Sequence, residues 1–206
     1  MRWLRRTTGG AHPALDVRVA DGFVALDTET TGMDARADRI VALGAVRWGA
    51  GGEIASFETL VDPGRPIPPA STAVHGIDDA AVRGAPSLHA ALPAFRAFIA
   101  DRVPVAHMGA FDLAFLQRPL AGAGLPALER MLDTAVLAAR LLPPLPELSL
   151  EAVCAHLGVS VTGRHTAIGD ARLAAALLVR LLPELERRGA AHLRDALHWG
   201  DVTRAP

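Results

Sequence analysis

The segment Phe23-Val24-Ala25-Leu26-Asp27-Thr28-Glu29-Thr30-Thr31-Gly32 carries the most informative structural pattern in this chain. Its first four residues are apolar and its last two form a turn, a pattern that predicts a short buried strand. Asp27 and Glu29 then lie at the carboxyl end of that strand and point to the same side, because side chains two apart on a strand share a face. Two carboxylates so placed suit Mg²⁺ or Mn²⁺, whereas an isolated Asp-x-Glu more often ends a strand in solvent.

Further apolar runs at residues 39–48 and 53–61 are separated by Gly49-Ala50-Gly51-Gly52, which indicates an antiparallel hairpin. Helical spacing then appears at Leu88, Leu92, Phe95 and Ile99, and residues 103–106 form another expected strand. More helices are expected at 113–120, 134–142, 149–157, 171–182 (ended by Pro183) and 190–199. This order predicts an α/β protein with a ribonuclease-H-like, mixed five-stranded sheet flanked by helices.

The composition of the 206 residues restricts the class of protein. Half are hydrophobic and 21% are charged, which fits one soluble globular domain better than a disordered chain. No apolar stretch reaches the roughly 20 residues that cross a bilayer, and no secretion signal is evident, so we expect a cytoplasmic protein without membrane contact. A net charge of −1 argues against a protein that coats long duplexes. The single cysteine, Cys154, excludes an internal disulfide and a cysteine-based zinc cluster.

Two later segments carry further acids. Asp112 follows a short strand and a turn, near the start of a helix, where taken alone it favours the helix dipole or caps the helix. In the segment from Arg164 to Asp170, Asp170 taken alone is a helix cap and His165 a loop histidine. Together with Asp27 and Glu29, these residues supply carboxylates for two cations and one base, the parts that phosphodiester hydrolysis requires.

On these residues the chain resembles the DEDDh 3′-to-5′ exonucleases of the DnaQ-like family, which include the epsilon subunit of bacterial DNA polymerase III. The resemblance covers about residues 22–187, with three motifs, at 23–32, 106–116 and 164–174, in the family's order. Shorter segments also match, at 74–77, 132–134 and 148–151.

The resemblance implies that two divalent cations, Mg²⁺ or Mn²⁺, are held by Asp27, Glu29, Asp112 and Asp170, with His165 as the general base. Histidine side chains accept protons near neutral pH. Tyrosine replaces this base in a sister group, but the chain contains no tyrosine. The implied reaction is attack of an activated water on the terminal phosphodiester, which releases a nucleoside 5′-monophosphate.

Further residues are expected to contact the terminal nucleotide, and all of them except Met108 also have a structural alternative as a turn, loop or core residue. They are Thr30, Thr31, Gly32, Met33, His75, Met108 and Phe111. Met108 departs from the family, whose second motif has His-Asn where this chain has His107-Met108, so a thioether replaces a carboxamide. We expect activity to be retained, because no metal ligand or base is missing, with rate or substrate preference altered.

The resemblance to the epsilon-like group implies single-stranded DNA 3′ ends as the substrate. The modest net charge suits an enzyme that grips only a few nucleotides. The alternatives are RNA 3′-end trimming by the same chemistry, or a non-catalytic module that binds nucleic-acid ends or a polymerase. Association with a DNA polymerase is a further possibility that the resemblance raises. The expected organisation is an N-terminal extension at 1–20, an exonuclease domain at 21–188 and a C-terminal helical extension at 189–206. Within the first extension, Trp3-Leu4-Arg5-Arg6 is a frayed end or a contact with nucleic acid or protein.

Overall fold

The computed structural model describes residues 16–202, in which five strands and seven α-helices form. Along the chain these are η2 (Val19–Asp21), β1 (Gly22–Thr30), β2 (Ile40–Gly49), β3 (Gly52–Leu60), α1 (Pro69–His75), α2 (Leu88–Ile99), β4 (Pro104–Ala106), α3 (Ala110–Gly122), β5 (Leu132–Asp133), α4 (Thr134–Leu141), α5 (Leu150–Leu157), α6 (Ala167–Arg187) and α7 (Leu193–Gly200). None of the helices in this range is long and apolar enough to span a bilayer.

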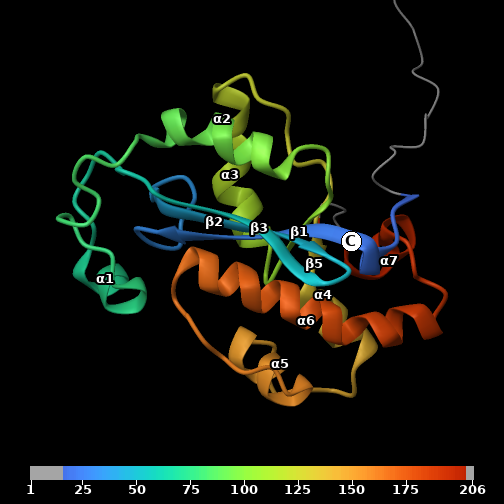
Figure 1. Cartoon of the computed structure of the whole chain (residues 1–206). Coiled ribbons are helices and arrows are strands. Elements are labelled where there is room, and N and C mark those ends of the chain that lie inside the picture. The colour runs from blue at the N-terminus through green and yellow to red at the C-terminus, as the bar shows by residue number, and fades with distance from the viewer. Residues whose placement is uncertain (1–15, 203–206) are drawn as a thin grey trace, which may run out of the picture.

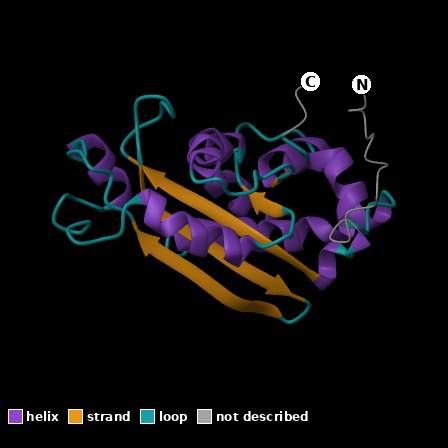
Figure 2. Ribbon diagram, turned by 90° about the horizontal axis from the view of Figure 1, so that it is seen from above, coloured by secondary structure: helices purple, strands orange, loops and turns teal. Residues whose placement is uncertain are grey.

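The five strands form one mixed sheet in the order β3-β2-β1-β4-β5, with β1 at its centre. The first three strands are antiparallel neighbours, while β4 and β5 run parallel to β1. Helices α2 and α3 cover one face of the sheet and α6 crosses the other (Figure 1), and the view from above shows the long strands side by side (Figure 2). The predicted architecture and the β2–β3 hairpin are therefore confirmed.

Strand β1 is buried on both faces. Phe23 and Ala25 belong to the core beneath α6, whereas Val24 and Leu26 belong to the core formed with α2 and α3. Alternate residues of a strand point to opposite faces of the sheet, so this partition follows directly from the apolar run in the sequence. Residues that follow Leu26 on the same strand are thereby directed to one side or the other.

Gly44 of β2 allows α6 to lie directly on the sheet. It is paired with Asp27 across the β1–β2 ladder. A Cβ at this position would lie 2.2 Å from the carbonyl carbon of Ala167 and 2.4 Å from the nitrogen of Ile168, both backbone atoms of the first turn of α6. Any larger residue would push the start of α6 away from β1, so this glycine sets the distance between strand and helix.

Helix α6 is longer than the sequence predicts. The expected stop at Pro183 is wrong, because the helix continues to Arg187. Proline removes one backbone hydrogen bond and its ring crowds the preceding turn. Leu181 and Leu185, on either side of it, are fully buried in the core beneath the sheet. The burial of these two side chains holds the last turn in helical form.

Helix α1, which the sequence pattern does not predict, follows the Pro-rich loop at residues 62–68. It stands apart from the sheet and from the helices that cover it (Figure 1). Pro69 occupies its first turn, where a missing N–H has no cost, and Gly76 ends it with a left-handed φ of 74°. Ser71 Oγ donates a hydrogen bond to the carbonyl of Thr31 at 2.8 Å. This contact ties α1 to the turn that follows β1.

The described parts of the two expected extensions pack into the core beneath α6. Val19 is fully buried there together with Leu193 and Leu197 of α7, the helix that the sequence predicts near the end of the chain. Residues 1–15, which include Trp3-Leu4-Arg5-Arg6, and residues 203–206 lie outside the described residues. The same hydrophobic core therefore contains residues from both sides of the expected boundaries at residues 20 and 188.

Replacing Gly44 by Ala is expected to destabilise the fold by about 1–3 kcal/mol, the usual cost of forcing a methyl group into a filled space. The added Cβ overlaps backbone atoms of α6, which cannot rotate away. Urea unfolding measures the loss. Gly51→Ala is the matched control, because nothing lies within 4 Å of a Cβ there. Equal stability of the two variants would contradict the close contact between Gly44 and α6.

Candidate metal centre

Three carboxylates meet at the carboxyl end of β1. Asp27 and Glu29 point to the α6 side of the sheet, because they continue the alternation of Phe23 and Ala25. Asp170 lies in the first turn of α6. One carboxylate oxygen from each of the three acids lies within 4.8 Å of the others. The three side chains are thus close enough to share one metal ion.

Asp112 reaches the same edge from the opposite face of the sheet. It lies in the first turn of α3 and is 2% exposed. Thr28 of β1, which points toward α3, donates from Oγ1 to Asp112 Oδ1 at 2.8 Å. Asp112 is not within the group of three, but its charge is close enough to oppose ionisation of Asp27. The structure therefore gathers all four predicted acids around β1.

Burial opposes the ionisation of these acids, and their mutual repulsion adds to it. Burial first, and then the charges of Asp112 and Asp170, raise the pKa of Asp27 well above its ordinary value. Burial and repulsion from Asp170 raise the pKa of Glu29 to about 7. Burial likewise raises the pKa of Asp112 to about 7, although the hydrogen bond from Thr28 acts in the opposite direction. A bound cation would favour the charged form of each carboxylate.

Asp170 shows that the cluster fits a cation. Its Oδ1 is buried and has no hydrogen-bond partner among the residues that the structure describes, while Oδ2 accepts a hydrogen bond from Arg164. A buried carboxylate oxygen without a donor is costly unless a cation or water meets it. The all-oxygen ligand set of Asp27, Glu29 and Asp170 is also the kind that Mg²⁺ and Mn²⁺ prefer.

His165 lies in the loop directly before α6. Its φ of 62° is left-handed, an uncommon conformation for a residue other than glycine, and its side chain is exposed. Thr166 Oγ1 accepts from the nitrogen of Gly169 at 3.1 Å and caps α6. Burial raises the pKa of Asp170, whereas the charges of Arg164 and His165 act to lower it. The predicted base is therefore within electrostatic reach of one of the predicted metal ligands.

Asp133, which was not among the predicted site residues, builds the turn that precedes Asp112. Its carboxylate accepts hydrogen bonds from the backbone nitrogens of Met108 at 3.1 Å, Gly109 at 2.8 Å and Ala135 at 2.8 Å. It thus caps α4 and also fixes the chain entering α3. An acid directly before a predicted helix is the sequence signal that marks it.

Met108 has an unusual backbone conformation. Its φ is 58°, in the left-handed region, and the residue is 50% exposed. The neighbouring His107 makes two contacts, with Thr134 Oγ1 at 2.9 Å and with the carbonyl of Leu148 at 2.8 Å. Asn adopts the left-handed region more readily than other residues with a side chain. The departure from the His-Asn pattern therefore places a methionine in a conformation that favours asparagine.

The last residue of β1 and the turn after it hold four of the residues predicted to contact a nucleotide. Thr30 Oγ1 donates to the carbonyl of Gly32 at 2.6 Å, and Thr31 Oγ1 donates to Asp38 at 3.2 Å. A Cβ at Gly32 would lie 2.4 Å from the Asp38 carboxylate, so the turn is tightly packed. Met33 is 82% exposed. The two hydroxyl groups thus shape the turn, and Met33 presents a free apolar side chain.

His75 and Phe111 make structural contacts. His75 Nε2 donates to the carbonyl of Thr30 at 3.2 Å, because its Nδ1 accepts from the nitrogen of Ile77 at 3.1 Å. The rings of Phe111 and Phe115 have centroids 4.8 Å apart. These contacts agree with the structural alternatives for both residues, and a contact with a nucleotide stays a prediction.

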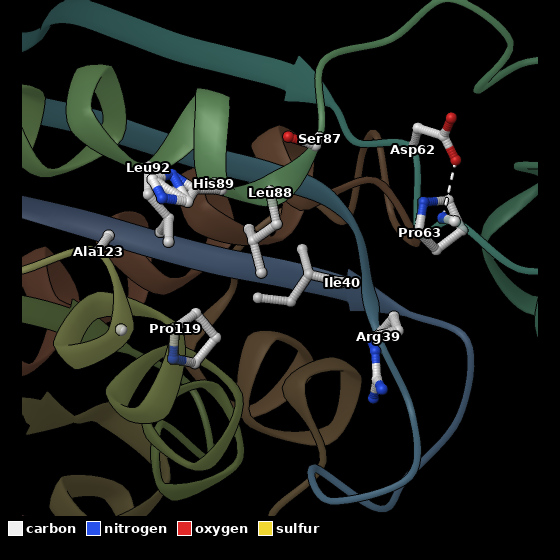
Figure 3. A pocket seen from close by; sticks show the side chains of 12 residues that line it. Arg39, Ile40, Asp62, Pro63, Ser87, Leu88, His89, Leu92, Pro119 and Ala123 are labelled. Atoms are coloured by element: carbon white, nitrogen blue, oxygen red, sulfur yellow. Dashed lines mark hydrogen bonds between the residues drawn. The ribbon is translucent and has the colours of Figure 1, made fainter.

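A separate cavity of about 530 Å³ lies between the start of α2, the end of α3 and the start of β2 (Figure 3). Ile40, Leu88 and Leu92 give it apolar walls, and Arg39 and His89 add polar groups. None of the four acids lines it. The cavity is therefore distinct from the carboxylate cluster.

Comparison with known sequences identifies relatives over most of the chain. The model of a family described as exonuclease matches residues 24–178. A DNA polymerase III subunit epsilon-like protein of Rhodobacter capsulatus is 44% identical over 172 residues, which are 81% of this chain and 24% of that protein. A PolC-type DNA polymerase III of Clostridium perfringens is 37% identical over 158 residues, 77% of this chain and 11% of that protein. The chain thus spans a minor part of the length of these relatives.

Solved structures share the fold. Exonuclease X in complex with 5′ overhanging duplex DNA matches with a TM-score of 0.66 and 28% identity, over 84% of this chain and 98% of that one. The nuclease domain of 3′hExo, a DEDDh family member bound to rAMP, matches with a TM-score of 0.69 and 15% identity, over 84% of this chain and 94% of that one. At that identity the second match supports the fold alone. Family and fold together confirm the predicted resemblance.

Replacing Glu29 by Gln is expected to stabilise the protein in EDTA above pH 7. The folded-state pKa of about 7 lies above the ordinary value of 4.5, so the wild type loses stability as the pH rises between these values. The loss continues as the pH rises through 7 and amounts to about 3 kcal/mol in total. Urea unfolding below pH 4.5 and above pH 7 measures it, with the exposed Glu129→Gln as control. A pH-independent difference between Glu29→Gln and wild type would contradict the shift.

Replacing Met108 by Asn is expected to stabilise the fold by about 1 kcal/mol, because asparagine tolerates the left-handed conformation better. Thermal and urea unfolding measure the change. Met33→Asn provides the control, since Met33 is also exposed but has no left-handed φ. A loss of stability in Met108→Asn would show that the methionine side chain makes a compensating contact.

Proposed function

Because the chain belongs to the exonuclease family, we propose that it acts in the 3′-to-5′ direction and releases nucleoside 5′-monophosphates from the 3′ ends of single-stranded DNA. The observation that carries the proposal is the convergence of Asp27, Glu29 and Asp170 within 4.8 Å, where the buried Oδ1 of Asp170 has no donor among residues 16–202. A shared cation explains why acids that repel one another are kept together.

Members of this family generally use two divalent ions, which supply an activated water and stabilise negative charge on the departing 3′ oxygen. We propose Mg²⁺ or Mn²⁺ here, held by Asp27, Glu29 and Asp170 from the α6 side and by Asp112 from the α3 side. Oxygen ligands of this type suit both ions. Thr28 supports the arrangement by holding one oxygen of Asp112 with a 2.8 Å hydrogen bond.

His165 is the proposed general base. Its place directly before α6 puts an exposed imidazole close enough for its charge to lower the pKa of Asp170, which supports His165 as the acceptor of a proton from a water near that acid. The left-handed φ of His165 and the cap formed by Thr166 fix the backbone of this loop. The loop and its cap thus set the backbone position of the proposed base.

The 3′-terminal nucleotide is proposed to lie along the turn after β1 and the turn before α3. The exposed side chains of Met33 and Met108 offer apolar surface for a base, an interaction that does not depend on base identity. Thr30, Thr31 and Gly32 provide the backbone of the first turn. His75 and Phe111 hold the surrounding structure through their contacts with Thr30 and Phe115, and direct nucleotide contact remains part of the proposal.

Single-stranded DNA is favoured as substrate because relatives are named as parts of DNA polymerase III. The net charge of −1 suits a short footprint with few phosphate contacts. A structural relative is described in complex with 5′ overhanging duplex DNA. Association with a DNA polymerase is proposed on the basis of relatives named as parts of DNA polymerase III. A cytoplasmic location and the division at residues 20 and 188 stay predictions.

Asp27→Asn is expected to reduce the release of mononucleotides from a single-stranded DNA oligomer with Mg²⁺ or Mn²⁺ by about a thousand-fold or more, as for other residues that act within one catalytic unit. Time-resolved digestion followed by separation of the products measures the rate. Glu129→Gln, an exposed acid outside the cluster, is the control and should match the wild type. Unchanged turnover in folded Asp27→Asn would contradict the assigned site.

The same digestion series decides the substrate when single-stranded DNA, mismatched primer-templates and a sequence-matched RNA are compared. Faster cleavage of RNA would replace DNA with RNA in the proposal, because contact with the 2′-hydroxyl distinguishes the two polymers. Binding of a 3′ end without release of nucleotide under either ion would contradict the proposed activity.

A further inference from the structure

Arg164 joins two acids that come from different helices. Its Nε donates to Glu151 Oε1 of α5 at 2.6 Å, and its Nη1 donates to Oδ2 of Asp170 in α6. The Arg164 side chain is only 26% exposed, and that of Asp170 only 6%. Because the guanidinium is planar and rigid, fixing one edge on Glu151 restricts where the remaining nitrogens point.

The contact with Arg164 divides the two oxygens of Asp170 between different tasks. Oδ2 is occupied by the guanidinium, whereas the buried Oδ1 has no donor among the residues that the structure describes. The Asp170 carboxylate also belongs to the group of three that converges within 4.8 Å. An arginine in this place thus leaves one oxygen of Asp170 available beside Asp27 and Glu29.

We propose that Arg164, anchored by Glu151, is a positioning residue that orients the Asp170 carboxylate toward the divalent cation. This inference rests on the proposed function, because it requires that the three acids hold an ion. Residues that hydrogen-bond to metal ligands commonly set ligand orientation, and their loss typically costs ten- to a hundred-fold in metal affinity or activity. Lysine would retain the charge but lacks the planar fork that engages both acids.

The competing interpretation is that Arg164 acts as a cation in its own right and opposes metal binding. The two interpretations predict opposite results when the charge is removed. If Arg164 positions Asp170, its removal frees the carboxylate to rotate and weakens binding. If Arg164 competes, its removal deletes a positive charge beside the three acids and strengthens binding.

The test is the dissociation constant for Mn²⁺ alone, measured by titration calorimetry on folded protein without nucleic acid. Arg164→Gln is expected to weaken Mn²⁺ binding about ten- to a hundred-fold, Arg164→Lys to restore it only in part, and Glu151→Gln to weaken it by a smaller factor. Arg172→Gln is the matched control, because Arg172 lies on the same helix as Asp170 and makes a comparable two-bond pair with Glu53, and it should bind as the wild type does.

Unchanged or tighter Mn²⁺ binding in folded Arg164→Gln overturns the inference, and so does full restoration by Arg164→Lys, which would show that charge alone matters. If Arg164→Gln does not fold, Mn²⁺ binding by Glu151→Gln is the deciding measurement. Unchanged affinity in that variant overturns the inference that Arg164, anchored by Glu151, positions Asp170. Failure of the wild type to bind Mn²⁺, or unaltered binding in Asp27→Asn, would instead contradict the proposed function. If the wild type binds Mn²⁺, Asp27→Asn does not, and Arg164→Gln binds as the wild type does, only the inference about Arg164 is contradicted.

Discussion

The repulsion among four closely placed carboxylates, of which Asp112 and Asp170 are buried and Asp27 and Glu29 partly buried, is the constraint on which the rest of the site depends. Burial and the neighbouring acids both disfavour the charged form of Asp27, so the cluster would separate if its backbone allowed it. The backbone does not allow it, because β1 lies at the centre of the sheet with a core on each face. The close approach of α6 at Gly44 then fixes Asp170 opposite the strand.

The surrounding structure offsets this repulsion in ways that leave room for a ligand. Asp112 and Asp170 both lie in the first turn of a helix, where the helix dipole favours negative charge. Thr28 donates to one and Arg164 to the other. Each contact occupies one oxygen and comes from outside the group of three. These donors therefore offset only part of the repulsion among the carboxylates. The remaining negative charge can still attract a cation.

The sequence predicts the parts of this arrangement that depend on local pattern. The apolar run before Asp27 is enough to predict a buried strand, and the spacing to Glu29 predicts their shared side. It does not reveal Gly44 as a contact point, because Ala167 is far away along the chain and only the fold brings them together. For the same reason the pairing of Arg164 with Glu151 and the continuation of α6 through Pro183 depend on tertiary packing that no local pattern encodes.

The location of His165 in a loop, where its φ is left-handed, affects how the residues of such a site can change during evolution. The four acids lie on a strand and two helices, where an insertion or a change of register would displace core side chains as well. The histidine belongs to the connection between α5 and α6, and its side chain is exposed, so a substitution at this one position leaves the packing of the sheet unchanged. Ligand set and proton acceptor can therefore change at different rates during evolution, although they serve a single reaction.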